Sequence, residues 1–230
     1  MTESEGFVTF TPPGISIEEM AGQVGRFFPD LGPVSIRQPM KSDGTSGDEM
    51  PDGETGEICY HPPIVVMGYY NEPEATAQAI TKDGILYTGD FGYFEHKISN
   101  EIGEYRALFL SGRRKFIIKP SGYQVFPDEV EAYISSHPAD DLADVEGLPH
   151  EIFGEAIFTF VHPKPDAMLT PEEVIEYCKG IASYKRPVHV EIWPIDQPLP
   201  LTRSAKVDKI EMNKLAMEVV NRLRASGKWD

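Results

Sequence analysis

SGRRKFIIKPSGYQVFPDEVE, residues 111 to 131, separates two halves of the chain that have different patterns. Four cations fall within residues 113 to 119, although the formal net charge of the 230-residue chain is -16. Farther along, Pro127 suits the first turn of a helix, and Asp128 and Glu129 lie where the helix dipole is positive. Gly122 allows a ligand to approach the backbone closely. A basic loop in an acidic chain indicates an anionic ligand, with a solvated hairpin as the alternative.

The two halves predict different folds. Before residue 111, apolar runs between turn residues predict strands within 34–40, 58–70, 85–90, 92–97 and 104–110, and one short helix within 71–80. After it, strands are predicted at 116–119, 123–126, 155–163 and 189–195, and helices within 127–138, 170–178 and 208–227. The sequence therefore predicts an α+β protein with a β-rich domain at 1–111 and an α+β domain at 112–230.

Local signals support two of these helices. Thr170 and Glu173 have the spacing of a capping box at a helix start. The apolar positions of the last helix have helical spacing and predict a packing stripe; they are Met212, Leu215, Ala216, Val219, Val220 and Leu223.

Composition narrows the class of protein. A sequence pI near 4.8 disfavours a nucleic-acid partner, because most of the surface would repel phosphates. The sequence has no apolar run of the roughly 18 residues that a membrane span needs, and its start lacks the pattern of a signal peptide. Cys59 and Cys178 suit two reduced, buried thiols, so we expect a cytoplasmic protein. The six histidines show no paired metal-ligand spacing.

Three short segments carry residues suited to chemistry. Thr88-Gly89-Asp90 follows a predicted strand, and a carboxylate in such a turn can accept hydrogen bonds from two neighbouring hydroxyls of a ribose. Arg113 can bind hydroxyls or a phosphate. Lys206, in the loop PLTRSAKVDK, is a compact charge suited to a phosphate or carboxylate. Taken singly, each of these residues could also be an ordinary turn or solvated loop residue without a role in ligand binding.

Taken together and in order, the segments resemble the second half of the acyl-adenylate-forming superfamily, which includes acyl-CoA and aryl-CoA ligases, firefly luciferase and the adenylation domains of peptide synthetases. The matching segments are MTES, GETGEICYHPPIVVMGYYNEPEAT, LYTGDFGYF, SGRRKFIIKPSGYQVFPDEVE, ASYKRPVHVEIW and PLTRSAKVDK. The resemblance covers residues 1 to 215. It implies a barrel-like end of the large AMP-binding domain at 1–111 and the mobile C-terminal domain at 112–230.

The resemblance also implies an activity. Members activate a carboxylic acid with ATP to an acyl-AMP and then transfer the acyl group to CoA, so the expected ligands are ATP or AMP, Mg²⁺ and CoA. Lys206 matches the lysine that acts in adenylation. Thr2 and Glu3 would lie at the α-phosphate and the Mg²⁺ ion as further catalytic residues.

The remaining roles follow in the same way. Asp90 would hold the ribose hydroxyls with Arg113 beside it, and Lys115 falls at the hinge on which the C-terminal domain turns. The face from Lys119 to Gly122 would meet CoA during thioester formation.

Two departures from the family pattern affect these expectations. Ala205 stands where the family usually has glycine, so the loop of Lys206 is expected to be less free. The family's glycine-rich phosphate loop and most of its acyl pocket lie upstream of Glu3, and the acidic stretch 42–54 does not replace that loop because its carboxylates would repel a triphosphate. The isolated chain is therefore expected to be inactive, with a missing amino-terminal half or self-association through an exposed apolar face.

Some alternatives stay open. A noncatalytic module of the same fold could bind a nucleotide or a protein partner, and the acceptor could be a carrier protein instead of CoA. The segments present do not indicate which acid is the substrate. A calcium site in 42–54 is the alternative to a solvated turn there, although the EF-hand spacing is absent.

Overall fold

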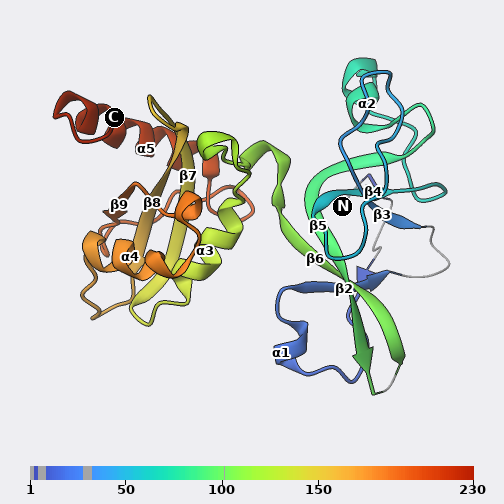
Figure 1. The fold of residues 1–230 in the computed structure, drawn as a ribbon, viewed down its shortest axis with the longest axis horizontal. Helices are drawn as coiled ribbons and strands as arrows, with labels where there is room; N and C mark the ends of the chain where they lie inside the picture. The colour runs from blue at the N-terminus through green and yellow to red at the C-terminus, as the bar shows by residue number, and fades with distance from the viewer. Residues whose placement is uncertain (1–2, 5–8, 28–32, 101) are drawn as a thin grey trace. The chain divides into compact units, whose positions relative to one another are not determined.

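The structure is a computed structural model that describes residues 3–4, 9–27, 33–100 and 102–230. The chain forms two compact units, Met1–Lys115 and Phe116–Asp230, and each is described by itself (Figure 1). The structure contains both sheets and helices, so the α+β class is confirmed. Among the described residues, no helix combines the length and the apolar character needed to cross a membrane.

The first unit is built on a six-stranded antiparallel sheet with the order β1-β2-β6-β5-β4-β3. The strands are β1 (Thr9–Phe10), β2 (Gln23–Phe27), β3 (Val34–Arg37), β4 (Gly56–Tyr60), β5 (Leu86–Ser99) and β6 (Gly103–Arg113). The long β5–β6 hairpin replaces the separate strands predicted at 85–90 and 92–97, because β5 continues through a register shift at Phe91/Gly92.

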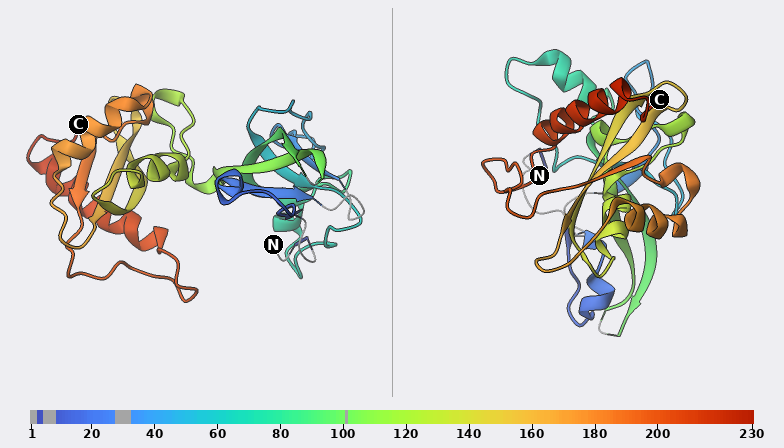
Figure 2. Two further views of the ribbon diagram at one scale, coloured as in Figure 1. Left: turned by 90° about the horizontal axis from the view of Figure 1, so that it is seen from below. Right: turned by 90° about the vertical axis from the view of Figure 1, so that its left-hand side faces the viewer.

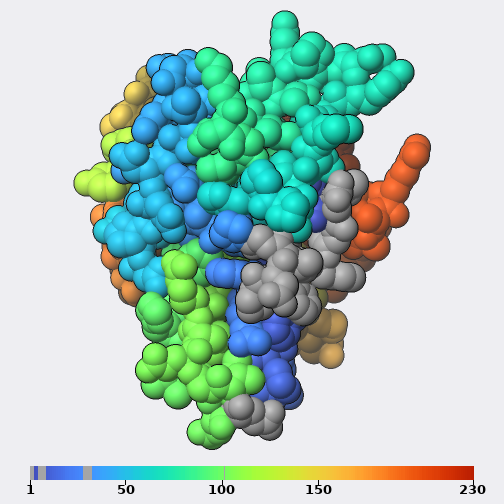
Figure 3. Space-filling model, turned by 90° about the vertical axis from the view of Figure 1, so that its right-hand side faces the viewer, coloured from blue at the N-terminus to red at the C-terminus, as the bar shows by residue number. Residues whose placement is uncertain are grey.

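Two short helices complete this unit, α1 (Ile17–Met20) and α2 (Pro73–Ala79). On the face of the unit drawn in Figure 3, α2 and the tip of the β5–β6 hairpin lie at opposite ends. The strand predicted over 58–70 ends early, at Tyr60, because Pro62 and Pro63 follow and proline cannot donate to a sheet. Buried residues of β3, β4, β5 and β6, Ile36, Ile58, Leu86 and Leu108 among them, form the core.

Residues 114 to 126 differ from the prediction. The segments 116–119 and 123–126 are not strands; the chain forms two turns of 3-10 helix, Arg114–Phe116 and Pro120–Gly122, and a single bridge between Ile118 and Val125. Ser121 and Gly122 both have positive φ, 50° and 85°, and such a tight reversal prevents extended pairing.

The second unit contains a three-stranded sheet of order β7-β8-β9. Strands β7 (Asp140–His150) and β8 (Gly154–Pro163) are antiparallel, and β9 (His189–Ile192) pairs parallel to β8. Helix α4 (Pro171–Tyr177) lies in the crossover between the parallel strands, as such connections require. Two further turns of 3-10 helix, Cys178–Gly180 and Ser183–Lys185, precede β9.

Helices cover both faces of this sheet. Helix α3 (Pro127–Ser135) and α4 pack on one face, and α5 (Lys209–Ala225) packs on the other, as the two views of Figure 2 show. The alternation within β8 explains this arrangement: Ile157 and Val161 belong to the first core, whereas Phe158 and Phe160 belong to the second. The predicted stripe of α5 is confirmed: four of its residues are buried in the second core, and Leu215 and Leu223 are partly buried against it.

Candidate functional site

A tight turn in β5 presents Asp90. Gly89 has φ +76°, a conformation that favours glycine, so the turn needs this residue. The Thr88 hydroxyl donates to the carbonyl of Ile58 at 2.8 Å and accepts from the amide of Asp90 at 3.1 Å. These bonds fix the turn to β4 on one side and fix the backbone of Asp90 on the other.

Asp90 and Arg113 form an ion pair that the sheet itself creates. They are directly opposite in the β5–β6 register, and Arg113 Nε lies 3.0 Å from Asp90 Oδ1. The Arg113 side chain is 60% exposed and that of Asp90 is 29% exposed, so both remain accessible to a ligand. A carboxylate has about four lone-pair sites, and the ion pair therefore leaves Asp90 able to accept hydrogen bonds from hydroxyl groups.

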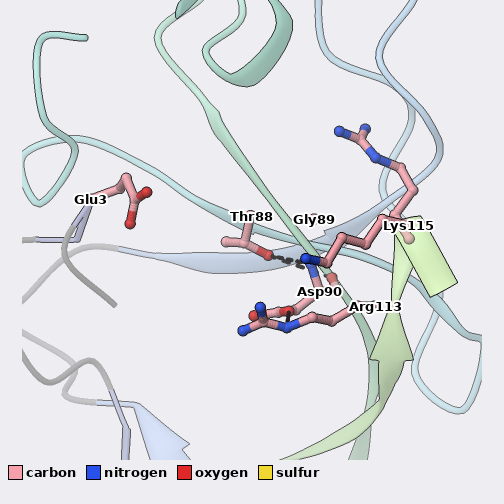
Figure 4. A pocket seen from close by; sticks show the side chains of 7 residues that line it. Glu3, Thr88, Gly89, Asp90, Arg113 and Lys115 are labelled. Carbon is pink, nitrogen blue, oxygen red and sulfur yellow. Dashed lines mark hydrogen bonds and ion pairs between the residues drawn. The ribbon is translucent and has the colours of Figure 1, made fainter. Parts of the chain in front are cut away.

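A cavity of about 590 Å³ contains this pair. Its lining residues are Glu3, Thr88, Gly89, Asp90, Arg113, Arg114 and Lys115, all from the first unit. Figure 4 shows Glu3 on the opposite side of the cavity from Asp90 and Arg113. The cavity thus brings carboxylate acceptors and cations together around one space, which suits a ligand that carries both hydroxyl groups and an anionic group.

Glu3 is held by the segment that follows β4. Its carbonyl accepts the amide of Val66 at 3.1 Å, and its Oε1 accepts the hydroxyl of Tyr69 at 3.2 Å. Partial burial, with Glu3 as a further cause, raises the pKa of Tyr69, so this hydroxyl keeps its proton and donates. Thr2, the other residue predicted at this end, lies outside the described residues.

Two residues beside the cavity were missed by the sequence analysis. Arg114 follows Arg113 directly, and its Nη1 lies 3.3 Å from Oε2 of the buried Glu57. Oε1 of Glu57 accepts the amide of Gly89 at 2.9 Å. Glu57 belongs to the quoted GETGE segment, whose matching glutamate was the only signal available for it.

The loop from Lys119 to Gly122 belongs to the second unit. The amide of Lys119 donates to Glu155 Oε2 at 2.6 Å and the amide of Ser121 donates to the carbonyl of Phe153 at 2.8 Å, so β8 and the turn before it anchor the loop. A Cβ added at Gly122 would meet no atom within 4 Å, which means that this glycine faces open space.

A second cavity, of about 350 Å³, lies beside this loop. The rings of Tyr123 and Tyr184 stack with their centroids 4.5 Å apart, and both line the cavity together with Arg186. Arg186 donates to the carbonyls of Ile181 and Lys179, each at 2.9 Å, which fixes its side chain. The sequence analysis quoted the segment that holds Tyr184 and Arg186 but assigned it no site.

Lys206 lies on an exposed loop of the same unit. Leu201 and Val207 form a bridge at the base of this loop, and the amide of Thr202 donates to the carbonyl of Lys206 at 2.7 Å. Ala205 has φ +57°, the left-handed conformation that glycine adopts without strain. The expected constraint at this position is therefore visible in the backbone.

The predicted site residues divide between the units. Glu3, Asp90, Arg113 and Lys115 line one cavity of the first unit, and Lys115 is the last residue of that unit. Lys119, Gly122 and Lys206 belong to the second unit. In the part of the chain that the structure describes, no group of three or more His, Cys, Asp or Glu side chains could hold a metal ion by itself.

Comparisons with known proteins add independent findings. A model of the AMP-binding enzyme C-terminal domain matches residues 129–206. Two Bacillus subtilis proteins, the putative acyl-CoA ligase YdaB and the putative acyl-CoA synthetase YngI, are each 33% identical to this chain, over 210 and 221 residues. These matches cover 90% and 96% of this chain but 37% of each relative, so the chain spans little more than a third of their length.

Solved structures give the same result. ATP-bound MatB from Rhodopseudomonas palustris matches with a TM-score of 0.76 and 28% identity, over 94% of this chain and 39% of MatB. The O-succinylbenzoate coenzyme A synthetase MenE from Bacillus subtilis, in complex with AMP, matches with a TM-score of 0.70 and 27% identity, over 92% of this chain and 39% of MenE.

Proposed function

Because the chain belongs to the acyl-adenylate-forming superfamily and corresponds to its carboxy-terminal portion, we propose that it forms part of an AMP-forming acid-CoA ligase. In this proposal the first unit is the end of the large AMP-binding domain and the second unit is the mobile C-terminal domain. The observation that carries the proposal is the single cavity that holds Glu3, the Asp90–Arg113 pair and Lys115.

The cavity of the first unit is the proposed nucleotide site. Asp90 accepts hydrogen bonds from the two ribose hydroxyls, and the ion pair with Arg113 keeps its carboxylate in place for this contact. Glu3, one carboxylate at the cavity wall, fits Mg²⁺ because that ion is commonly bound by one or two carboxylates together with substrate phosphates and water. When bound, the ion would neutralise phosphate charge.

Lys206 is the proposed catalytic cation of the first step. An oxygen of the acid's carboxylate attacks the α-phosphorus of ATP and pyrophosphate leaves, so that negative charge increases on the phosphoryl oxygens. A cation held ready for that charge lowers the barrier without reorganising. Lys206 sits on a loop closed by the Leu201–Val207 bridge, which suits delivery of one ammonium group. The second unit turns about Lys115 after this step and withdraws Lys206.

CoA is the proposed acceptor in the second step, in which its thiol attacks the acyl carbonyl and AMP leaves. The cavity beside Gly122 supports this assignment: the stacked rings of Tyr123 and Tyr184 suit a flat or apolar part of the ligand, and Arg186 suits a phosphate. Lys119 and Gly122 form the proposed contact face. A carrier protein is the alternative acceptor, and the test between them is thioester formation with free CoA.

The proposed location is the cytoplasm. Cys59 and Cys178 are both free and buried, and burial raises the pKa of Cys178 to about 11. A buried thiol with a raised pKa is unreactive, which fits packing residues in a reducing compartment.

The nucleotide site can be tested on the chain itself by NMR. AMP is titrated into the ¹⁵N-labelled chain and the amide signals of Gly89, Asp90 and Arg113 are followed. We expect these signals to shift with AMP and to require at least about tenfold more 2′,3′-dideoxy-AMP, because that ligand lacks both hydroxyls. Equal responses to the two ligands, or no response to AMP, would contradict the proposed site.

A further inference from the structure

Glu57 is a buried carboxylate that joins two segments of the first unit. It lies in β4, where the β4–β5 register shifts between Glu57 and Cys59, and its side chain is 1% exposed. A bulge of this kind redirects side chains. A carboxylate this deeply buried is costly unless each oxygen has a partner.

Each oxygen of Glu57 serves a different segment. Oε1 accepts the amide of Gly89, the central residue of the turn that presents Asp90. Oε2 lies 3.3 Å from Arg114 Nη1, and Arg114 directly precedes Lys115, the last residue of the unit. The Arg114 side chain is 53% exposed, so it reaches the buried carboxylate from the solvent side.

The Glu57 carboxylate holds two partners at once, an ion pair with Arg114 and a hydrogen bond from the amide of Gly89, so the two contacts depend on each other. Burial, with the nearby Asp90 carboxylate as a further cause, raises the pKa of Glu57, while the Arg114 guanidinium and the Gly89 amide oppose part of that rise. If one partner moves away, the carboxylate loses part of what keeps it ionised, and its bond to the other partner weakens.

We propose that Glu57 is a positioning residue that couples the nucleotide-binding turn at Thr88–Asp90 to the hinge segment at Arg114–Lys115. This inference rests on the proposed function, because it takes the turn as the ribose site and Lys115 as the hinge. A nucleotide that orders the turn also orders Arg114 through the shared carboxylate. Occupancy of the site is thereby reported to the segment on which the second unit turns.

The test uses limited trypsin digestion of the whole chain, with cleavage after Arg113, Arg114 and Lys115 followed by mass spectrometry. Glu57→Gln keeps an oxygen that can accept from Gly89 but removes the charge that holds Arg114. Without nucleotide, we expect this variant to be cut at these bonds about tenfold faster than the wild type, because the ordered state of the segment has lost its ionic contact.

The decisive comparison adds AMP. We expect AMP to slow cleavage of the wild type, whereas Glu57→Gln still binds AMP by NMR within about threefold but gains little or no protection at the hinge. A residue that only stabilised the fold would give both proteins the same protection. Equal protection in the two proteins, or an undiminished cleavage rate in the wild type with AMP bound, would overturn the proposal.

Two further variants keep the outcome clear. Glu49→Gln removes a solvent-exposed partner of Arg37, 3.8 Å away, and should leave hinge cleavage and AMP protection unchanged.

If Glu57→Gln does not fold, Arg114→Gln breaks the same pair. Hydrogen exchange of the amides at 112–116 should then become faster, and AMP should no longer protect these amides. Unchanged exchange in a folded Arg114→Gln protein would also overturn the proposal. Failure of AMP to shift the wild-type signals counts against the proposed function, while the nucleotide-free rates still decide whether Glu57 holds Arg114.

Discussion

Asp90 and Arg113 stand opposite each other on β5 and β6, and their side chains form an ion pair with a 3.0 Å contact between Oδ1 and Nε. The pair lies at the wall of the larger cavity, with both side chains accessible to solvent. An exposed ion pair of this kind contributes little to stability, which leaves both side chains available for the proposed role in ligand binding.

Asp90→Asn should therefore separate binding from stability. We expect AMP binding to weaken by about tenfold or more, because the amide cannot accept from both ribose hydroxyls as a carboxylate does. The free energy of unfolding should change by less than about 1 kcal/mol. NMR titration and urea unfolding measure the two quantities. Asp48→Asn, which breaks the exposed pair with Lys41, is the control and should change neither.

Ala205→Gly should stabilise the second unit. The left-handed conformation of Ala205 destabilises the folded protein by about 1–2 kcal/mol, and glycine relieves this strain. The greater freedom of glycine in the unfolded chain offsets about 0.4–1 kcal/mol of that stabilisation. We expect a net increase of up to about 1.6 kcal/mol in the free energy of unfolding. Both tryptophans, Trp193 and Trp229, lie in this unit, so their fluorescence reports its unfolding in urea.

Ala216→Gly is the matched control for that measurement. Ala216 is buried within α5, and glycine there should lower the free energy of unfolding by about 1 kcal/mol or more. Destabilisation by Ala205→Gly would show that the loop of Lys206 does not carry the strain that its φ indicates.

Glu146 should make the stability of the second unit depend on pH. Burial raises its pKa to about 7 from an ordinary value of 4.5, although Asn213 donates to its Oε2 at 2.7 Å. The charged groups around it are Asp144 and Glu131, which both contact Lys209; Asp144 and Glu131 raise the pKa and Lys209 lowers it. The carboxyl group is therefore more easily kept protonated in the folded protein than in the unfolded chain.

The sign of the effect follows from this displacement. The stabilisation from neutral Glu146, measured as free energy of unfolding, is complete below about pH 4.5. It is lost as the pH rises to about 7, because in that window Glu146 ionises freely only in the unfolded chain. Glu146→Gln should remove this loss, so its free energy of unfolding should exceed that of the wild type by about 1–3 kcal/mol between pH 5 and pH 8. Urea unfolding across that range is the measurement, and the exposed Glu218→Gln is the control. Parallel curves for wild type and Glu146→Gln would refute the assignment.

The sequence predicted the features that local signals specify. Helices α3, α4 and α5 were predicted because Pro127, the Thr170–Glu173 capping box and the apolar stripe of α5 each act within a few residues, and the structure shows all three. The superfamily predicted from the ordered motifs is confirmed by the family match and the relatives.

Features that depend on distant pairing were missed. Strand β7 carries acidic residues and a proline, and only its register with β8 identifies it as a strand. The Glu57–Arg114 contact joins residues 57 positions apart, so no local pattern could indicate it. Asp90 and Arg113 were each predicted as site residues, but their contact arises from the β5–β6 register. The roles assigned to the predicted site residues all stay predictions, those of Glu3, Asp90, Arg113 and Lys115 as well as those of Lys119, Gly122 and Lys206.

The most direct test of the proposed function measures the two half-reactions separately. The chain replaces the corresponding carboxy-terminal portion of YngI, with which it is 33% identical over 221 residues, and the hybrid enzyme is assayed for acyl-AMP formation and for thioester formation from preformed acyl-AMP. Lys206→Ala should slow the first step by about a hundredfold or more and leave the second nearly unchanged. Gly122→Val should do the opposite, since its side chain would strain the left-handed backbone there (φ +85°) and project into open space on the proposed CoA side. Equal damage to both steps by Lys206→Ala, or a folded hybrid that forms no acyl-AMP, would contradict the account.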